Sequence, residues 1–283
     1  MTATVNPPGT NSPATDATTG RRTPTPIPAA GFGDVLRAEA IKFWTVRGTR
    51  WSLIAVVVLG VGLTTAVCWG SADWLAGGEA DEVPASFVTW GAMIAQIPAI
   101  VLGALVITSE YGTGLIRATF AATPHRGRVV AAKALVLTAA LLVAGTVTAV
   151  GGYLAGNWFL TDAGVGVPWG TDGLVRALFG TAVVMALMGL LAFAVGLLVR
   201  HTAAAISIVL GTVAVLANLA WALPGDWGAA IARVIPGNST QALTSVIPFN
   251  PDSLGPWTGL AVLAGQIAVL LALGAYSVQR RDA

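Results

Sequence analysis

Residues 174–199 read LVRALFGTAVVMALMGLLAFAVGLLV, an apolar run in which Arg176 is the only charged side chain. A helix needs about 20 apolar residues to cross the hydrocarbon core of a bilayer, so this run is long enough to span it. Five further runs have the same character. The six predicted spans are residues 51–70, 84–107, 134–156, 174–199, 202–223 and 257–278. The sequence therefore predicts an all-α polytopic membrane protein with six transmembrane helices.

Composition excludes a soluble domain. The chain has 283 residues, of which 55% are hydrophobic and 10% are charged, whereas about 25% of the residues of an average soluble protein are charged. Its mean hydropathy is +0.76, so the apolar side chains cannot all be buried in one core and must face lipid. The single cysteine, Cys68, excludes an intrachain disulfide and a multi-cysteine metal site.

Three segments follow one another along the chain. Residues 1–31 hold six prolines, eight threonines and few large apolar side chains, which predicts a disordered tail. Residues 32–50 are predicted to form an interfacial connecting helix, and residues 51–283 the six-helix transmembrane domain. The distribution of Lys and Arg sets the orientation: 13 lie in the tail, in the second-to-third and fourth-to-fifth connections and at the C-terminus, and two lie on the other side. By the positive-inside rule both termini are expected to be cytoplasmic.

The predicted interfacial helix carries a carboxylate on its apolar face. Five apolar side chains project within an arc of about 100° around Glu39: Phe32, Val35, Leu36, Phe43 and Val46. Glu39 then either reaches the headgroup layer or meets a cation from another element. A further interpretation makes Glu39 and Lys42 contacts to a cytoplasmic partner.

The loop between the second and third spans carries the most information about function. Residues 108–128 read TSEYGTGLIRATFAATPHRGR. Gly112 and Gly114 allow the chain to turn out of the membrane, residues 115–122 can form two helical turns, and Pro124 ends them. We expect a short helix across the cytoplasmic mouth that can transmit a push from below to both spans. The alternative is a plain basic loop.

The same loop resembles a known family. The motifs that carry the resemblance are Glu110-Tyr111-Gly112-Thr113-Gly114, Ile116-Arg117, and Pro124-His125-Arg126-Gly127-Arg128 up to Lys133. They resemble the loop after the second span of ABC-2 type permeases, the membrane subunits of ATP-driven exporters. Residues 37–42 before 47–51 are similar to the connecting helix of that family. With the six-span layout, the resemblance covers residues 33–283.

The resemblance implies a permease subunit that exports an amphipathic or hydrophobic substrate across the bacterial inner (cytoplasmic) membrane. It also implies a 2:2 complex with an ABC-type ATP-binding subunit and a second permease copy or paralogue, surrounded by membrane lipid and without nucleic acid. By analogy, the residues that couple the chain to the ATPase are Glu110, Tyr111, Gly112, Thr113, Gly114 and Arg117, with Glu39 and Lys42 beside them.

The chain itself is not expected to be an enzyme. A P-loop requires a lysine after a glycine, yet Lys42 follows Ile41 and Lys133 follows Ala132, and the chain has no other lysine. No cofactor is therefore expected on this chain, and ATP and Mg would bind the partner subunit. The alternative function is an ion-coupled secondary transporter, or another polytopic protein without an ATPase partner. A secondary transporter usually buries ionisable residues near the midplane, and the predicted spans provide none there.

Two other features are candidates for the transport path. The connection from residue 224 to residue 256 resembles the outer gate of the family, with Pro236, Asn238 and Gln241 as gate residues; the alternative is a surface lid. Within the spans, the side-chain amides are those of Gln96, Asn218 and Gln266. They either tie helices together or line the pathway.

Overall fold

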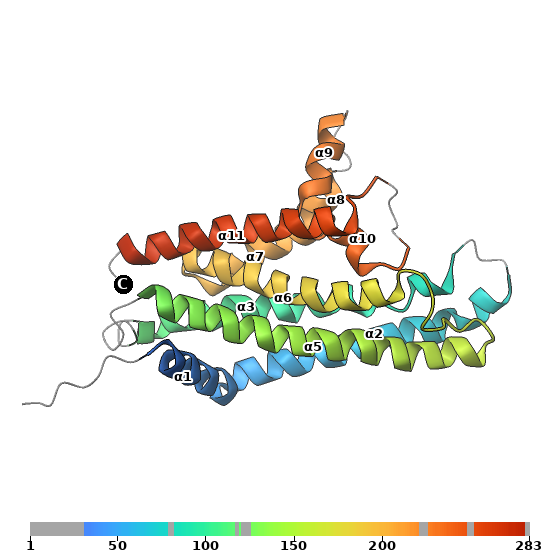
Figure 1. Cartoon of the computed structure of the whole chain (residues 1–283), viewed down its shortest axis with the longest axis horizontal. Helices are drawn as coiled ribbons and strands as arrows, with labels where there is room; N and C mark the ends of the chain where they lie inside the picture. The colour runs from blue at the N-terminus through green and yellow to red at the C-terminus, as the bar shows by residue number, and fades with distance from the viewer. Residues whose placement is uncertain are drawn as a thin grey trace, which may run out of the picture.

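The computed structural model of the chain describes residues 31–78, 82–116, 119, 126–220, 226–247 and 252–280. These residues form helices and connections without a β-strand (Figure 1). The predicted tail, residues 1–31, lies outside this part of the chain except for Gly31, whose backbone N–H bonds Asp34 Oδ2 at the start of the first helix.

The helices follow the predicted order. They are α1 (Phe32–Thr45), α2 (Arg47–Ala76), α3 (Gly91–Thr113), α5 (Arg126–Asp162), α6 (Leu174–Val199), α7 (Thr202–Leu210), α8 (Ala217–Ala220), α9 (Asp226–Val234), α10 (Gln241–Thr244) and α11 (Pro256–Arg280). A 3₁₀ turn, Pro84–Ser86, precedes α3.

Six helical segments are long and apolar enough to cross a membrane. They are Arg47–Ala76, Pro84–Thr113, Arg126–Asp162, Leu174–Val199, Thr202–Ala220 and Pro256–Arg280. Each contains most or all of one predicted span, so the prediction of an all-α chain with six helices long and apolar enough to cross a membrane is confirmed for the described residues. Four of the helices run past the predicted limits, because hydropathy marks the part of a helix that lies in hydrocarbon and not where its backbone hydrogen bonds end.

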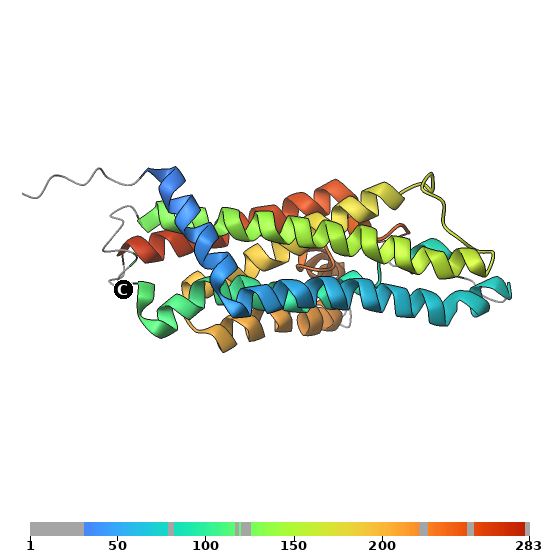
Figure 2. The same cartoon turned by 90° about the horizontal axis from the view of Figure 1, so that it is seen from below.

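α6 is the central helix of the bundle. It packs against α3, α5 and α11, and α2 packs on the other side against α3 and α5 (Figures 1 and 2). In the most apolar 18-residue stretch of α6, 72% of the residues are buried inside the structure, whereas in the corresponding stretches of α2 and α11 only 22% are buried. The outer helices therefore leave most of their apolar side chains for lipid, as a membrane bundle requires.

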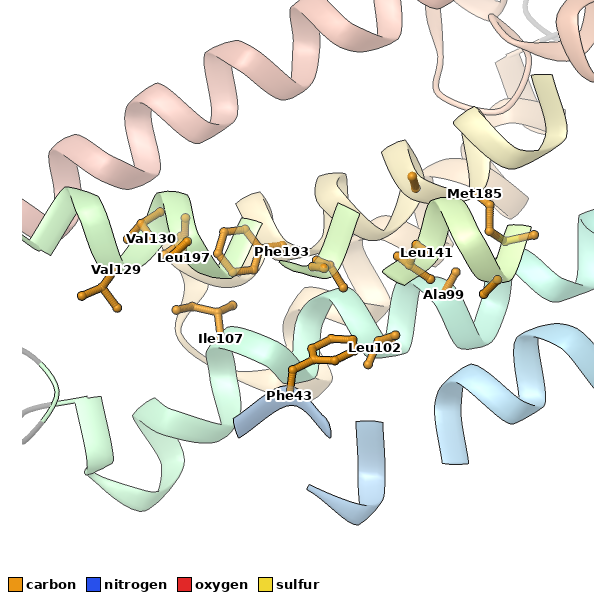
Figure 3. Packing of buried hydrophobic residues seen from close by; sticks show 14 of the residues in the cluster. Phe43, Ala99, Leu102, Ile107, Val129, Val130, Leu141, Met185, Phe193 and Leu197 are labelled. Carbon is orange, nitrogen blue, oxygen red and sulfur yellow. The ribbon is translucent and has the colours of Figure 1, made fainter. Parts of the chain in front are cut away.

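Close approach of α3 and α6 depends on two glycines. A Cβ on Gly103 would lie 1.9 Å from the carbonyl oxygen of Gly189, so the two backbones are in contact where these residues meet. Small residues at helix crossings are the usual basis of tight packing in membranes. Larger side chains, among them Leu102, Leu141 and Phe193, fill the space on either side (Figure 3).

The interfacial helix predicted for residues 32–50 is shorter than expected. α1 ends at Thr45, Val46 is extended at φ −73° and ψ 124°, and Arg47–Arg50 already belong to α2. A continuous helix would carry α1 onward along the axis of α2. The bend at Val46 instead turns α1 across the ends of α2 and α5, where Phe43 enters the core (Figures 2 and 3).

The fifth span is interrupted by a π-turn. Gly211–Leu216 lies between α7 and α8, and the N–H of Ala217 bonds the carbonyl of Thr212, five residues earlier. The packing changes at this turn. Ala205 and Val209 of α7 belong to a core cluster shared with α6 and α11, whereas Ala217 and Ala220 of α8 pack with Ala232 and Ile235 at the end of α9.

Candidate functional site

Four charged side chains from three helices meet at one end of the bundle. Lys133 Nζ of α5 donates to Oε2 of Glu39 in α1 at 2.7 Å and to Oε1 of Glu110 in α3 at 2.7 Å. Lys42 Nζ of α1 donates to the same Glu110 oxygen at 2.6 Å and to Oε1 of Glu39 at 3.3 Å. We call Glu39, Lys42, Glu110 and Lys133 the charge cluster. Each acid contacts both bases, so the cluster ties α1, α3 and α5 together.

The charge cluster is buried and neutral. Glu39, Glu110 and Lys133 are 6%, 4% and 3% exposed, while the side chain of Lys42 is 39% exposed. Removing a charge from water is costly, and two acids facing two bases offset that cost only while all four stay in place. At Lys42 burial opposes the charged form, yet hydrogen bonds and attraction to Glu110 and Glu39 hold the pKa above its ordinary value. The ammonium is therefore kept protonated.

Glu39 resolves an alternative that the sequence left open. Its carboxylate lies on the buried face of α1 beside Val35 and Phe43 and meets a cation from another element, Lys133. It does not reach outward to a headgroup layer. Glu39 and Glu110 thus face the interior of this chain, and only Lys42 of the cluster is substantially open to the outside.

The end of α3 is also joined to the start of the fifth span. The guanidinium of Arg200 lies 5.0 Å from the ring centroid of Tyr111, and the hydroxyls of Thr108 and Thr202 are 2.7 Å apart. Arg200 follows α6 in a left-handed conformation, at φ 58°, which lets the chain reverse directly into α7. Through Thr108, Glu110 and Tyr111, the end of α3 therefore contacts α1, α5, α7 and Arg200, the residue between α6 and α7.

The turn after α3 differs from the predicted one. Gly112 was expected to help turn the chain, but α3 continues through Gly112 and Thr113, and only Gly114 takes the left-handed conformation, at φ 72°. A glycine permits a turn without requiring one, and a single residue with positive φ suffices to end a helix. Gly112, Thr113 and Gly114 are exposed.

Part of the predicted short helix over residues 115–122 is visible. Leu115, Ile116 and Thr119 are helical, and the hydroxyl of Thr119 donates to the carbonyl of Leu115 at 3.1 Å. Arg117 and Pro124 lie outside the described residues. Ile116 is buried and belongs to the same core cluster as Phe43, so this turn packs back onto the bundle.

A cavity of about 360 Å³ adjoins the charge cluster. Besides the four charged residues it is lined by side chains of α1, α2, α3 and α5, among them Phe43, Thr49, Val106, Ser109 and Val136. Oε2 of Glu110 is buried and has no hydrogen-bond partner among the residues that the structure describes. The charged side chains therefore have space in which to change position, and Glu110 Oε2 can accept a further hydrogen bond. Among the described residues, no three His, Cys, Asp or Glu side chains form a group that could hold a metal ion.

The other end of the bundle holds the predicted gate residues. Pro236 is buried, the amide of Asn238 donates to the carbonyls of Ala217 and Ala232 at 3.1 and 3.2 Å, and Gln241 begins α10. We call residues 235–245 the outer segment. It lies between α6 and α11, and Ser239 and Thr240 are almost completely buried.

Backbone contacts hold the outer segment. A Cβ on Gly259 of α11 would lie 1.6 Å from the carbonyl oxygen of Ser239, and one on Gly180 of α6 would lie 2.3 Å from that of Leu243. Arg176 of α6 donates to the carbonyls of Ser245 and Val246, each at 3.1 Å. This charged residue, inside a predicted span, therefore satisfies main-chain acceptors.

The three amide residues in the spans differ in role. Gln266 Nε2 bonds the carbonyl of Val234 at 2.8 Å, which links α11 to the end of α9. Asn218 is exposed, and within the described part of the chain its side chain bonds the carbonyl of Ala214, four residues earlier in the same span, at 2.7 Å. Gln96 is half-buried on α3. Gln266 also lines a cavity of about 550 Å³ between α6, the fifth span and α11, together with Thr212 and Pro236.

Sequence reasoning missed three residues that organise these sites. Lys133, Arg200 and Arg176 were not predicted as site residues, yet each joins elements distant in the sequence. A usable signal existed for Lys133. The chain has two lysines, and each precedes a predicted span on the side of the membrane to which Glu39 and Glu110 are also assigned, so ion pairs among these four residues could have been expected. A scan against models of protein families gives no match, and a search of curated proteins gives none either.

Proposed function

We propose that the chain is the permease subunit of an ABC-2 type exporter, driven by ATP hydrolysis on a separate subunit. The observation that carries this proposal is the charge cluster, which fastens a helix lying outside the spans, α1, to two spanning helices directly beside the Gly114 turn. A passive channel or scaffold does not require such a joint. A transporter driven by a subunit docked at one end requires such a connection between the docking region and its spanning helices.

The proposed contact surface is the exposed turn itself. Gly112, Thr113 and Gly114 present backbone and one small side chain to the outside, and Leu115 adds an exposed apolar side chain. Glu110 precedes them in the charge cluster. A displacement of this turn would act through Glu110 on both lysines and so on α1 and α5. In this proposal the exposed residues touch the ATPase, and Glu39 and Glu110 position the helices that move.

The proposed orientation places the charge cluster at the cytoplasmic face. α1 and the end of α11 lie at the same end of the bundle as the cluster (Figures 1 and 2), and 13 of the 15 Lys and Arg residues are in segments assigned to that side. The positive-inside rule then makes both termini cytoplasmic and α1 an interfacial helix of the bacterial inner membrane. The outer segment would be the gate on the opposite face, and substrate would pass along the seam of a permease dimer.

An ion-coupled transporter is the competing proposal, since Glu110 and Lys133 lie inside helices that can span the membrane. Their depth argues against it. Glu110 is about 8 residues from the middle of α3, or about 12 Å at the rise of an α-helix, and Lys133 is about 11 residues, or about 17 Å, from the middle of α5. Both therefore lie toward one end of their helices. A coupling ion bound near the midplane would be out of their reach.

The decisive experiment purifies the chain, tagged, from its native host in detergent. We expect a complex of two permeases with two ATP-binding subunits, in which ATP hydrolysis is faster or slower than for the ATPase subunit alone. Glu110→Gln should leave the complex assembled and remove this effect of the permease on the ATPase rate. Glu82→Gln, an exposed carboxylate of the opposite end, is the matched control.

Two results would refute the proposal. One is a purified chain without any ATP-binding subunit that dissipates a proton or sodium gradient in vesicles. The other is a complex in which Glu110→Gln and Glu82→Gln leave the ATPase rate equally unchanged.

A further inference from the structure

An open apolar groove runs along the outside of the bundle between α2 and α5. Its volume is about 870 Å³ and all its lining side chains are apolar. α1 closes one end with Leu36, Ala40 and Trp44, at the place where it crosses the ends of α2 and α5 (Figure 2). On α1 the groove is lined by residues other than those of the charge cluster, and the groove shares only Val136 of α5 with the cavity beside the cluster.

The dimensions of the groove fit one leaflet of a bilayer. Along α5 it extends from Leu135 to Val147, which is about 18 Å at the rise of an α-helix. Half of a hydrocarbon core of about 30 Å is about 15 Å. The α5 side of the groove includes three alanines, Ala139, Ala140 and Ala144, whose small side chains leave room for a hydrocarbon chain beside the helix.

The closed end of the groove is basic. Arg47 and Arg50 lie seven and four residues before Ile54, which lines the groove, and so share its face of α2. Arg37 likewise shares a face of α1 with Trp44, seven residues on. The three arginines are exposed, and none forms an ion pair among the described residues. Asp34, one turn before Arg37, is the nearest acid on that face and is bonded to the N–H of Gly31.

We propose that the groove binds an acyl chain of an anionic phospholipid whose headgroup is held by Arg47 and Arg50. The chain fills the apolar surface between α2 and α5, and the phosphate accepts hydrogen bonds from the guanidinium groups at the level of α1. Trp44, which is 56% exposed, has the amphipathic ring typical of that level. The proposal does not depend on transport or on an ATPase.

Native mass spectrometry of the full-length chain in neutral detergent tests the proposal. Phosphatidylglycerol and phosphatidylcholine with identical acyl chains are added in equal amounts, and the lipid retained is counted. We expect phosphatidylglycerol to be retained preferentially by the unmodified chain. Since a basic residue near an anionic lipid contributes on the order of fivefold in affinity, Arg47→Gln/Arg50→Gln should lower this preference by about tenfold or more. Arg280→Gln, an exposed arginine of α11 at the same end of the bundle, should leave it unchanged.

The groove is tested separately from the headgroup. Ala139→Leu should reduce retention of both lipids, because it narrows the groove, whereas Ala264→Leu, an exposed alanine of α11, should not. Equal retention of the two lipids by the unmodified chain would overturn the proposal, as would equal losses in the Arg47/Arg50 and Arg280 variants. Binding of water-soluble glycerol phosphate as tightly as of the lipid would show that no acyl chain occupies the groove.

Discussion

The two ends of this bundle are held together by opposite means. At one end the charge cluster joins α1, α3 and α5 through long side chains, and each charged group has two partners. At the other end the outer segment is held by main-chain carbonyls and by backbone contacts at Gly180 and Gly259. Long side chains can exchange partners while helices shift, whereas a backbone contact without room for a methyl group cannot. The comparison indicates that the charged end can rearrange and that the outer end is fixed until its segment is displaced as a whole.

The largest expected effect concerns the charged end. Glu110→Gln leaves two ammonium groups facing the single carboxylate of Glu39, and breaking a buried ion pair costs about 3–5 kcal/mol. We expect a loss of about 4 kcal/mol, measured as a lower unfolding temperature and a lower denaturant midpoint in detergent.

A double variant separates charge balance from packing. Glu110→Gln/Lys133→Met keeps the cluster neutral, with Glu39 and Lys42 remaining, so it should be less destabilised than the sum of the two single variants. Additive losses would mean that the four groups do not act as one cluster.

The next effect concerns the fixed end. Gly259→Ala places a methyl group within 1.6 Å of the Ser239 carbonyl oxygen, so the outer segment must move. Overpacking of this kind costs about 1–3 kcal/mol, and we expect the upper end of that range in the same unfolding assay. Gly265→Ala, with nothing within 4 Å of its Cβ, is the control on the same helix and should be neutral. Equal stability of the two variants would show that the segment is not held by backbone contact.

A smaller effect distinguishes the two asparagines. Asn238→Ala removes two hydrogen bonds to carbonyls of other elements and should cost about 1–2 kcal/mol. Asn218→Ala removes one bond within its own helix at an exposed position and should cost less than about 0.5 kcal/mol. Thermal unfolding of the two purified variants measures the difference. If Asn218→Ala were more destabilising than Asn238→Ala, the structural role that we assign to Asn238 would be contradicted.

The smallest effect is the pH dependence at Lys42. Its pKa is raised on folding, so its contribution is fully present below the ordinary lysine pKa of about 10.4 and is lost as the pH rises through the folded value. Because Lys42 is partly exposed, the contribution is at most about 1 kcal/mol. Lys42→Arg stays charged and should unfold at a higher temperature than the unmodified chain only at strongly alkaline pH. If the unfolding temperatures of Lys42→Arg and of the unmodified chain differed by the same amount at every pH, the raised pKa assigned to Lys42 would be contradicted.

The sequence was sufficient for the six helices because apolar length is a local property. It was also sufficient to place Glu39 on the buried face of α1, since helical periodicity shows which side a residue faces. The partner of Glu39 could not be predicted in this way. Lys133 lies 94 residues away, and only the packing of α1 on α5 brings the two together.

Local turn chemistry was less reliable. Gly112 and Gly114 have the same conformational freedom, yet the helix continues through the first and ends at the second. Conversely, α1 ends at Thr45, and the extended residue after it, Val46, carries no terminating signal; the chain bends there while Phe43 packs in the core. Tertiary contacts determine both outcomes, and no pattern in the neighbouring residues encodes them.

The π-turn at Gly211–Leu216 divides the fifth span into two helical parts, α7 before it and α8 after it. α7 packs in the bundle against α6 and α11. α8 packs with the end of α9 through a small apolar cluster formed by Ala217, Ala220, Ala232 and Ile235. The wider turn between α7 and α8 lacks regular α-helical hydrogen bonding, so it is the position at which the span would bend most easily. A bend at this turn would move α8 together with α9, against the hydrogen bond from Gln266 of α11 to Val234, while α7 keeps its packing on α6 and α11.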